Sequence, residues 1–112
     1  MESDLITLTR QEMFAIIRKH LLTQNVQAVG AIGCSYRGHN GTKCAIGILI
    51  PDDKYDPNME GAQIHSSPRV RALFMESDLS FLYDIQNIHD GYMPNEWPER
   101  LEAFRVRWGL EN

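Results

Sequence analysis

The side chains with the most recognisable chemistry in this 112-residue chain are two cysteines and four histidines. A thiol activated by an imidazole can act as a nucleophile, and the same two groups are ligands for zinc. Cys34 and Cys44 do not form the closely spaced pair that begins a zinc site, and no two histidines are close enough in sequence to do so. The sequence therefore predicts no metal, no cofactor and two free thiols that pack as small apolar side chains.

Carboxylates are concentrated between Pro51 and Gly61, where Asp52, Asp53, Asp56 and Glu60 could bind a cation or act as general acids and bases. This segment lacks the alternating ligands and the central glycine of an EF-hand loop. Its prolines and turn-forming residues, without a hydrophobic period, predict a long loop. Long loops in small domains are often functional, so this loop is the first place to look for a binding site.

A glycine-containing turn precedes the loop and carries basic and aromatic side chains on either side. Arg37 and Lys43 could bind an acidic partner or a phosphate, and Tyr36 could stack on a base. Nothing in the pattern requires five of the nearby residues for folding: Arg37, His39, Asp53, Tyr55 and Glu60. Together with Tyr36, Lys43 and Asp52, they form the binding surface that the sequence predicts.

The first helix is predicted from a capping box. Thr9 and Glu12 can each accept a hydrogen bond from the other's backbone amide, which starts a helix that extends to about Gln24. An apolar stripe then faces the core, formed by Met13, Phe14, Ile17 and Leu21.

Apolar residues alternate from residue 32 to residue 50, which predicts a β-hairpin. A three-residue loop from His39 to Gly41, with Gly41 in the left-handed conformation, places all the apolar side chains on one face. In this register the predicted pairs are Tyr36 with Cys44, Cys34 with Ile46, and Ile32 with Ile48.

The second half of the chain is predicted to be helical. Ser67 and Pro68 begin one helix, Ser77 or Asp78 begins a second that stops near Gly91, and a last helix extends from Trp97 to Trp108 with Gly109 as a left-handed cap. The expected fold is α+β, a single domain over residues 1–112 in which a small hairpin packs against about four helices.

Composition and charge restrict the class of function. The hydrophobic fraction of 43% suits a globular chain, and no apolar run is long enough to span a membrane. The net charge of −4 divides into +2 over residues 1–50 and −6 over residues 51–112, without the basic stripe of a nucleic-acid-binding protein. We therefore expect a cytoplasmic protein that contacts neither a membrane nor nucleic acid directly.

One stretch resembles a known group of proteins. Cys34, Tyr36 and Arg37 lead into a Lys-Cys-Ala-x-Gly strand at 43–47, a Leu-Ile-Pro-Asp-Asp segment at 49–53 and a Tyr-Asp-Pro segment at 55–57. This combination resembles small uncharacterised proteins of bacteriophages and prophages.

The resemblance implies a protein that acts in the cytoplasm of a bacterial host and inhibits a host factor, such as a component of a defence system. Two other functions are compatible with the residues. One is a protein that sequesters a nucleotide signal through Tyr36, Arg37 and Lys43, and the other is a small hydrolase or transferase that uses Cys44, or Asp52 and Asp53, with a histidine.

Overall fold

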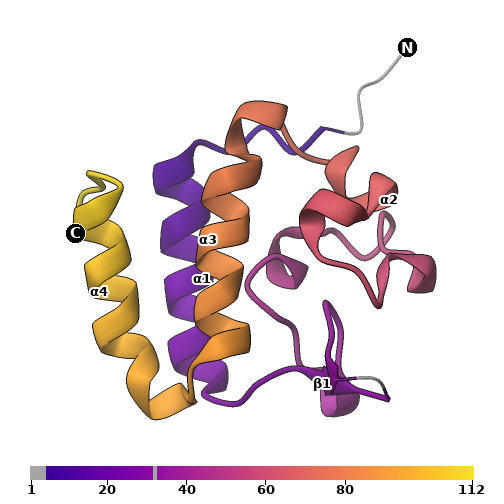
Figure 1. Ribbon diagram of the computed structural model, residues 1–112, viewed down its shortest axis with the longest axis horizontal. Helices are drawn as coiled ribbons and strands as arrows, with labels where there is room; N and C mark the ends of the chain where they lie inside the picture. The colour runs from indigo at the N-terminus through magenta and orange to yellow at the C-terminus, as the bar shows by residue number, and fades with distance from the viewer. Residues whose placement is uncertain (1–4, 32) are drawn as a thin grey trace.

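Three helices form one side of the molecule (Figure 1). The computed structural model describes residues 5–31 and 33–112. Helix α4 (Trp97–Arg107) packs against both α1 (Arg10–Gln24) and α3 (Leu79–Gly91). The ring of Phe104 in α4 joins the three helices, because its centroid lies 5.9 Å from that of Phe14 in α1 and 5.1 Å from that of Phe81 in α3.

The rest of the chain lies on the side of α3 that faces away from α4 (Figure 1). It contains a small antiparallel hairpin of β1 (Val29–Gly30) and β2 (Gly33–Cys34), several short 3₁₀ helices, and α2 (Pro68–Arg71). The predicted α+β domain with about four helices is confirmed. Within the two described ranges, no helix has both the length and the apolar character needed to cross a membrane.

The capping box of α1 is present as predicted. The Thr9 hydroxyl accepts from the Glu12 amide at 3.1 Å, and the Glu12 carboxylate accepts from the Thr9 amide at 2.8 Å. The helix ends at Gln24, followed by Asn25 in the left-handed conformation. The predicted apolar stripe is buried, and it consists of Met13, Phe14, Ile17 and Leu21.

The later helices also follow their local signals. The Ser67 hydroxyl accepts from the Val70 amide and caps α2, although that helix is only four residues long. Helix α3 ends at Gly91, and Gly109 after α4 has the predicted left-handed backbone, with a φ of 66°.

The predicted hairpin over residues 32–50 is only partly correct. Its turn is confirmed, because Arg37 pairs with Lys43 in the predicted register and Gly41 is left-handed with a φ of 74°. The pairing of Cys34 with Ile46 is wrong, since Cys34 pairs with Val29 instead. The predicted partner of Ile48 was Ile32, which lies outside the described residues.

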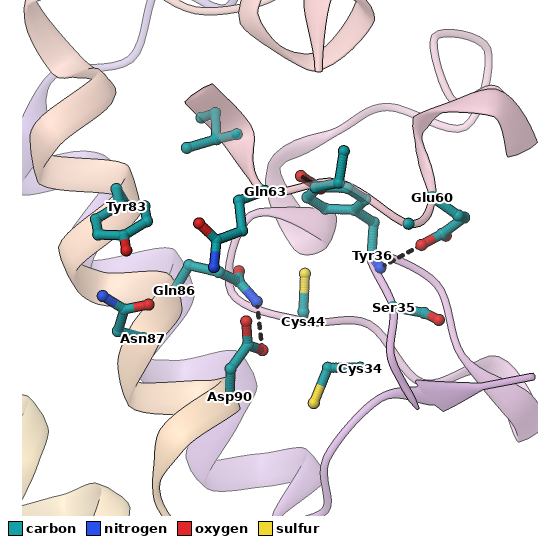
Figure 2. A pocket seen from close by; sticks show the side chains of 13 residues that line it. Cys34, Ser35, Tyr36, Cys44, Glu60, Gln63, Tyr83, Gln86, Asn87 and Asp90 are labelled. Carbon is teal, nitrogen blue, oxygen red and sulfur yellow. Dashed lines mark hydrogen bonds between the residues drawn. The ribbon is translucent and has the colours of Figure 1, made fainter. Parts of the chain in front are cut away.

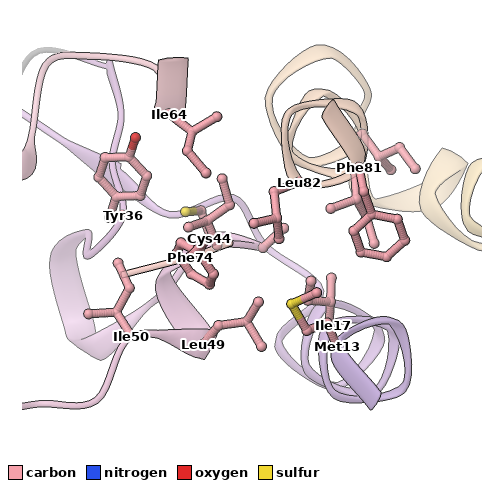
Figure 3. Close-up of a cluster of buried hydrophobic side chains, with 14 of the residues drawn as sticks. Met13, Ile17, Tyr36, Cys44, Leu49, Ile50, Ile64, Phe74, Phe81 and Leu82 are labelled. Atoms are coloured by element: carbon pink, nitrogen blue, oxygen red, sulfur yellow. The ribbon is translucent and has the colours of Figure 1, made fainter. Parts of the chain in front are cut away.

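Pairing stops soon after the turn because the chain leaves the extended conformation before Gly47, where Ile46 has right-handed helical angles, with a φ of −74° and a ψ of −38°. A Cβ atom on Gly47 would lie 2.0 Å from the Tyr36 carbonyl oxygen, so the two backbones are in close contact. A 3₁₀ helix, Gly47–Leu49, follows and carries the chain through the centre of the molecule. Figure 3 shows Cys44, Leu49 and Ile50 enclosed among side chains from several segments, all of them buried: Met13, Ile17, Ile64, Phe74 and Leu82.

Candidate functional site

A pocket of about 230 Å³ lies between α3 and two segments from the middle of the chain (Figure 2). Its walls are residues 34–36, which include the end of β2, residues 60–64, the thiol-bearing Cys44, and four residues of α3. The α3 residues are Tyr83, Gln86, Asn87 and Asp90.

Helix α3 places these four side chains on one face because they are spaced three, four and seven residues apart. The apolar face of the helix is buried in the core and carries Leu79, Phe81, Leu82, Ile85 and Ile88. The polar face of an amphipathic helix that packs on a core normally points to solvent. Here residues 60–64 lie opposite it, and the face becomes the wall of a pocket.

Asp90 is held in position by His89, which is completely buried. The Ala28 amide donates to His89 Nε2 at 2.9 Å, so this nitrogen carries no proton. The proton of the neutral ring therefore lies on Nδ1, which donates to Asp90 Oδ1 at 2.6 Å. Gln86 donates to the same oxygen at 2.8 Å.

Cys34, His89 and Asp90 bring three potential metal ligands within 4.8 Å of one another. A metal bound at His89 Nδ1 would need the lone pair of that atom, so the proton of the neutral ring would move to Nε2. The Nε2–H group would then face the N–H group of Ala28, and two donors cannot form a hydrogen bond with each other. Because both ring nitrogens are committed, the His89 environment does not fit a metal ligand.

The two cysteines, both free, differ in exposure and neither is activated. Burial raises the pKa of the Cys34 thiol, and the Asp90 charge and a hydrogen bond to Asp90 raise it further. Cys44 is fully buried, which raises its pKa to about 12. Both groups are protonated at neutral pH, which is the opposite of what a nucleophile requires.

Most of the residues predicted to form a binding surface contact one another. Glu60 accepts from the amides of Tyr36, at 2.9 Å, and Arg37, at 3.1 Å, and from the Tyr55 hydroxyl at 2.6 Å. The Arg37 guanidinium lies 4.6 Å from the centre of the Tyr55 ring and 2.7 Å from an oxygen of Asp52. We call Arg37, Asp52, Tyr55 and Glu60 the loop latch, because they fasten the acidic loop to the turn.

Arg37, Tyr55 and Glu60 therefore contact other parts of the protein, which the sequence did not predict. Lys43 joins the latch more loosely, with its ammonium 3.7 Å from Asp52. Tyr36 and Glu60 also line the pocket. His39 and Asp53 are exposed and lie outside the pocket, so the structure does not bring all eight predicted residues to one site.

Sequence reasoning did not find Gln63, Tyr83, Asn87 or Asp90. A signal was present for three of them, because polar residues recur at helical spacing beside the apolar stripe of α3. No such signal exists for Gln63, which reaches the pocket from the segment before α2.

Comparison of the chain with models of protein families, with curated proteins and with solved structures gives no significant match.

Proposed function

We propose that this protein is a binding protein that holds a small polar group in the pocket beside α3. One observation carries the proposal. Among the described residues, the side-chain polar groups of Gln63, Tyr83 and Asn87 line the pocket without a hydrogen-bond partner in the protein. Pockets that recognise ligands combine a concave surface with a few convergent polar groups of this kind.

Asp90 adds a charged acceptor to these three groups. Its carboxylate accepts from His89 and Gln86, both through Oδ1, and a carboxylate has about four lone-pair sites. At least one site therefore remains for a ligand. The His89 and Gln86 contacts fix the carboxylate before any ligand arrives, which reduces the entropy lost on binding.

The chemistry of the pocket favours binding over catalysis. Both cysteines are protonated, and His89 has no nitrogen available as a base. His20 donates to the Lys43 carbonyl at 2.7 Å, and it lies outside the pocket. A hydrolase or transferase based on Cys44 and a histidine has no support in this arrangement.

The phosphate of a nucleotide is also a poor match for the pocket. Among the described lining residues there is no lysine or arginine, and the two candidates, Arg37 and Lys43, pair with Asp52. An inhibitor of a host factor, which the resemblance to phage proteins implies, could use the pocket to hold one side chain of its target.

Nuclear magnetic resonance can test the proposal directly. The ¹⁵N-labelled protein is titrated with a panel of small cationic, neutral and anionic compounds, and the side-chain amide signals of Gln63 and Asn87 are followed. We expect at least one compound to shift both signals, and Asn87→Ala to abolish its binding. Asn95→Ala is the matched control, because Asn95 is exposed and outside the pocket. A panel that leaves both amide signals unmoved would overturn the proposal.

A further inference from the structure

We infer that the group bound in this pocket is an organic cation, a guanidinium or a protonated amine, whose N–H groups donate to Asp90 and to the amide oxygens of Gln63 and Asn87. This inference rests on the proposed function. It adds the chemical class of the ligand.

The inference begins with the charges around the pocket. Two carboxylates line it, Glu60 and Asp90, and no lysine or arginine is among the described lining residues. The Glu60 carboxylate already accepts three hydrogen bonds, from two backbone amides and from Tyr55. Asp90 is therefore the anion with the greater capacity for a ligand.

The two basic side chains that could bind an anion, Arg37 and Lys43, do not pair with Asp90. The Arg37 guanidinium contacts Asp52, donates to the Ile50 carbonyl at 2.9 Å and lies over the Tyr55 ring. The Lys43 ammonium also pairs with Asp52, at 3.7 Å. His89 donates to Asp90 as a neutral ring and adds no full charge.

The acidic groups that line the pocket respond to this negative field. The pKa values of Cys34, Tyr36 and Cys44 are all raised, mainly by burial, and the Asp90 charge contributes to each of the three shifts. A field that opposes the ionisation of a thiol or a phenol favours a bound cation and opposes a bound anion.

The size and the donor pattern of the pocket narrow the ligand further. A volume of about 230 Å³ corresponds to roughly seven or eight water molecules at about 30 Å³ each. That space suits a guanidinium or ammonium group with a short aliphatic stem. A guanidinium presents five N–H donors in one plane, enough for the Asp90 carboxylate and two amide oxygens at once.

Cys34 provides a direct probe of the field, because it is an exposed thiol on the pocket wall whereas Cys44 is buried. Two methanethiosulfonate reagents of similar size, one with a trimethylammonium group and one with a sulfonate, are compared at Cys34. The rate constant of the cationic reagent is divided by that of the anionic reagent. This ratio is then normalised by the same ratio measured with free 2-mercaptoethanol. Because both reagents attack the same thiol, its pKa cancels from the ratio.

We expect the normalised ratio to favour the cation by about tenfold, as for one unit charge about 6 Å away in a water-like medium. Asp90→Asn should bring the ratio close to one, while the amide oxygen of the substituted side chain can still accept from His89 and Gln86. Asp53→Asn, which removes an exposed carboxylate outside the pocket, should leave the ratio unchanged. A ratio near one in the unmodified protein, or one that Asp90→Asn does not alter, would overturn the inference.

Calorimetric titration then tests whether the ligand is a cation separately from whether the pocket binds a ligand at all. The probes are agmatine, the uncharged N-butylurea with the same four-carbon stem, adenosine monophosphate, and the peptide Gly-Gly-Arg-Gly-Gly. We expect agmatine or the peptide to bind at least tenfold more tightly than N-butylurea, with the difference lost in Asp90→Asn. Tighter binding of the peptide would identify a protein side chain as the source of the cation, and tighter binding of agmatine a free small molecule.

Two negative results have different meanings. Equal binding of N-butylurea and agmatine, with shifts at the Gln63 and Asn87 amides, would overturn the cation class and leave the proposed binding function intact. No binding by any probe, together with a rate ratio near one at Cys34, would count against both.

Discussion

His89 donates its Nδ1 proton to Asp90 across 2.6 Å, and the backbone amide of Ala28 fixes this tautomer by donating to Nε2 at 2.9 Å. The buried ring also stacks on Trp97, with 5.6 Å between the ring centroids. The segment after α1, the α4 tryptophan and the pocket carboxylate therefore meet at one imidazole. His89 supports the site without contacting the space where a ligand would lie.

The first prediction concerns this imidazole. His89→Phe keeps a ring beside Trp97 but leaves the buried Ala28 amide without an acceptor, which should lower the free energy of unfolding by about 1–3 kcal/mol. Urea denaturation measures the change. His65→Phe is the matched control, because His65 is exposed and its ring contacts Tyr83 without a hydrogen bond. Equal stability of the two variants would contradict the role assigned to His89.

The second prediction concerns the loop latch. Glu60→Gln replaces one accepting oxygen with an NH₂ group, so at least one of the three donors at Glu60 loses its partner. We expect a loss of about 1–3 kcal/mol in unfolding free energy and faster proteolysis between Pro51 and Glu60. Asp53→Asn should change stability by less than about 0.5 kcal/mol, because Asp53 is exposed. If both variants unfold like the unmodified protein, Glu60 does not fasten the loop.

The sequence was most informative where structure depends on neighbouring residues. The capping box of Thr9 and Glu12, the Ser67 cap and the left-handed Gly109 each involve atoms a few positions apart, so their types and spacing predict the outcome. The turn at Gly41 belongs to the same class. All four features are present.

Prediction was weaker where contacts join distant segments. Ile46, Ile48 and Ile50 alternate as in a strand, but a short apolar run is also compatible with a non-strand segment in the core. In the structure this run forms a turn and a 3₁₀ helix, with Ile46 and Ile50 buried and Ile48 partly buried. Glu60 could not be assigned to the amides of Tyr36 and Arg37 from sequence, because only the folded loop brings them together.

The pocket illustrates the same limit. Tyr83, Asn87 and Asp90 share a helical face that can be read from their spacing, but a polar face on an amphipathic helix normally points to solvent. The position of Gln63 and its neighbours over that face is a tertiary feature with no local signal.

The third prediction tests the close approach between the backbones of Gly47 and Tyr36. Gly47→Ala would place a methyl group 2.0 Å from the Tyr36 carbonyl oxygen, and backbone at both positions would have to move. We expect a loss of about 1–3 kcal/mol or more in unfolding free energy. Gly91→Ala is the control, because a Cβ atom there meets nothing within 4 Å, and it should be neutral or stabilising by up to about 1 kcal/mol. Thermal and urea unfolding of the two variants give the comparison, and similar losses in both would argue against a contact specific to Gly47.

The last prediction concerns the thiols and alkaline pH. In the native protein, Ellman's reagent should titrate Cys34 and leave Cys44 unreacted until the chain is unfolded, because only Cys34 is exposed.

Burial raises the pKa of Cys44 from its ordinary 9.0 to about 12, so the native state holds this proton more tightly than the unfolded chain does. The stability that this tighter binding contributes is fully present below the pKa of Cys44 in the unfolded chain. It is lost as the pH rises from that value through the pKa of Cys44 in the folded protein. Unfolding free energy should therefore fall as the pH rises from 9.0 toward about 12. Cys44→Ala lacks the thiol, so it should be less stable at neutral pH and show a shallower decline; an identical decline would assign the pH dependence to other groups, such as Tyr36.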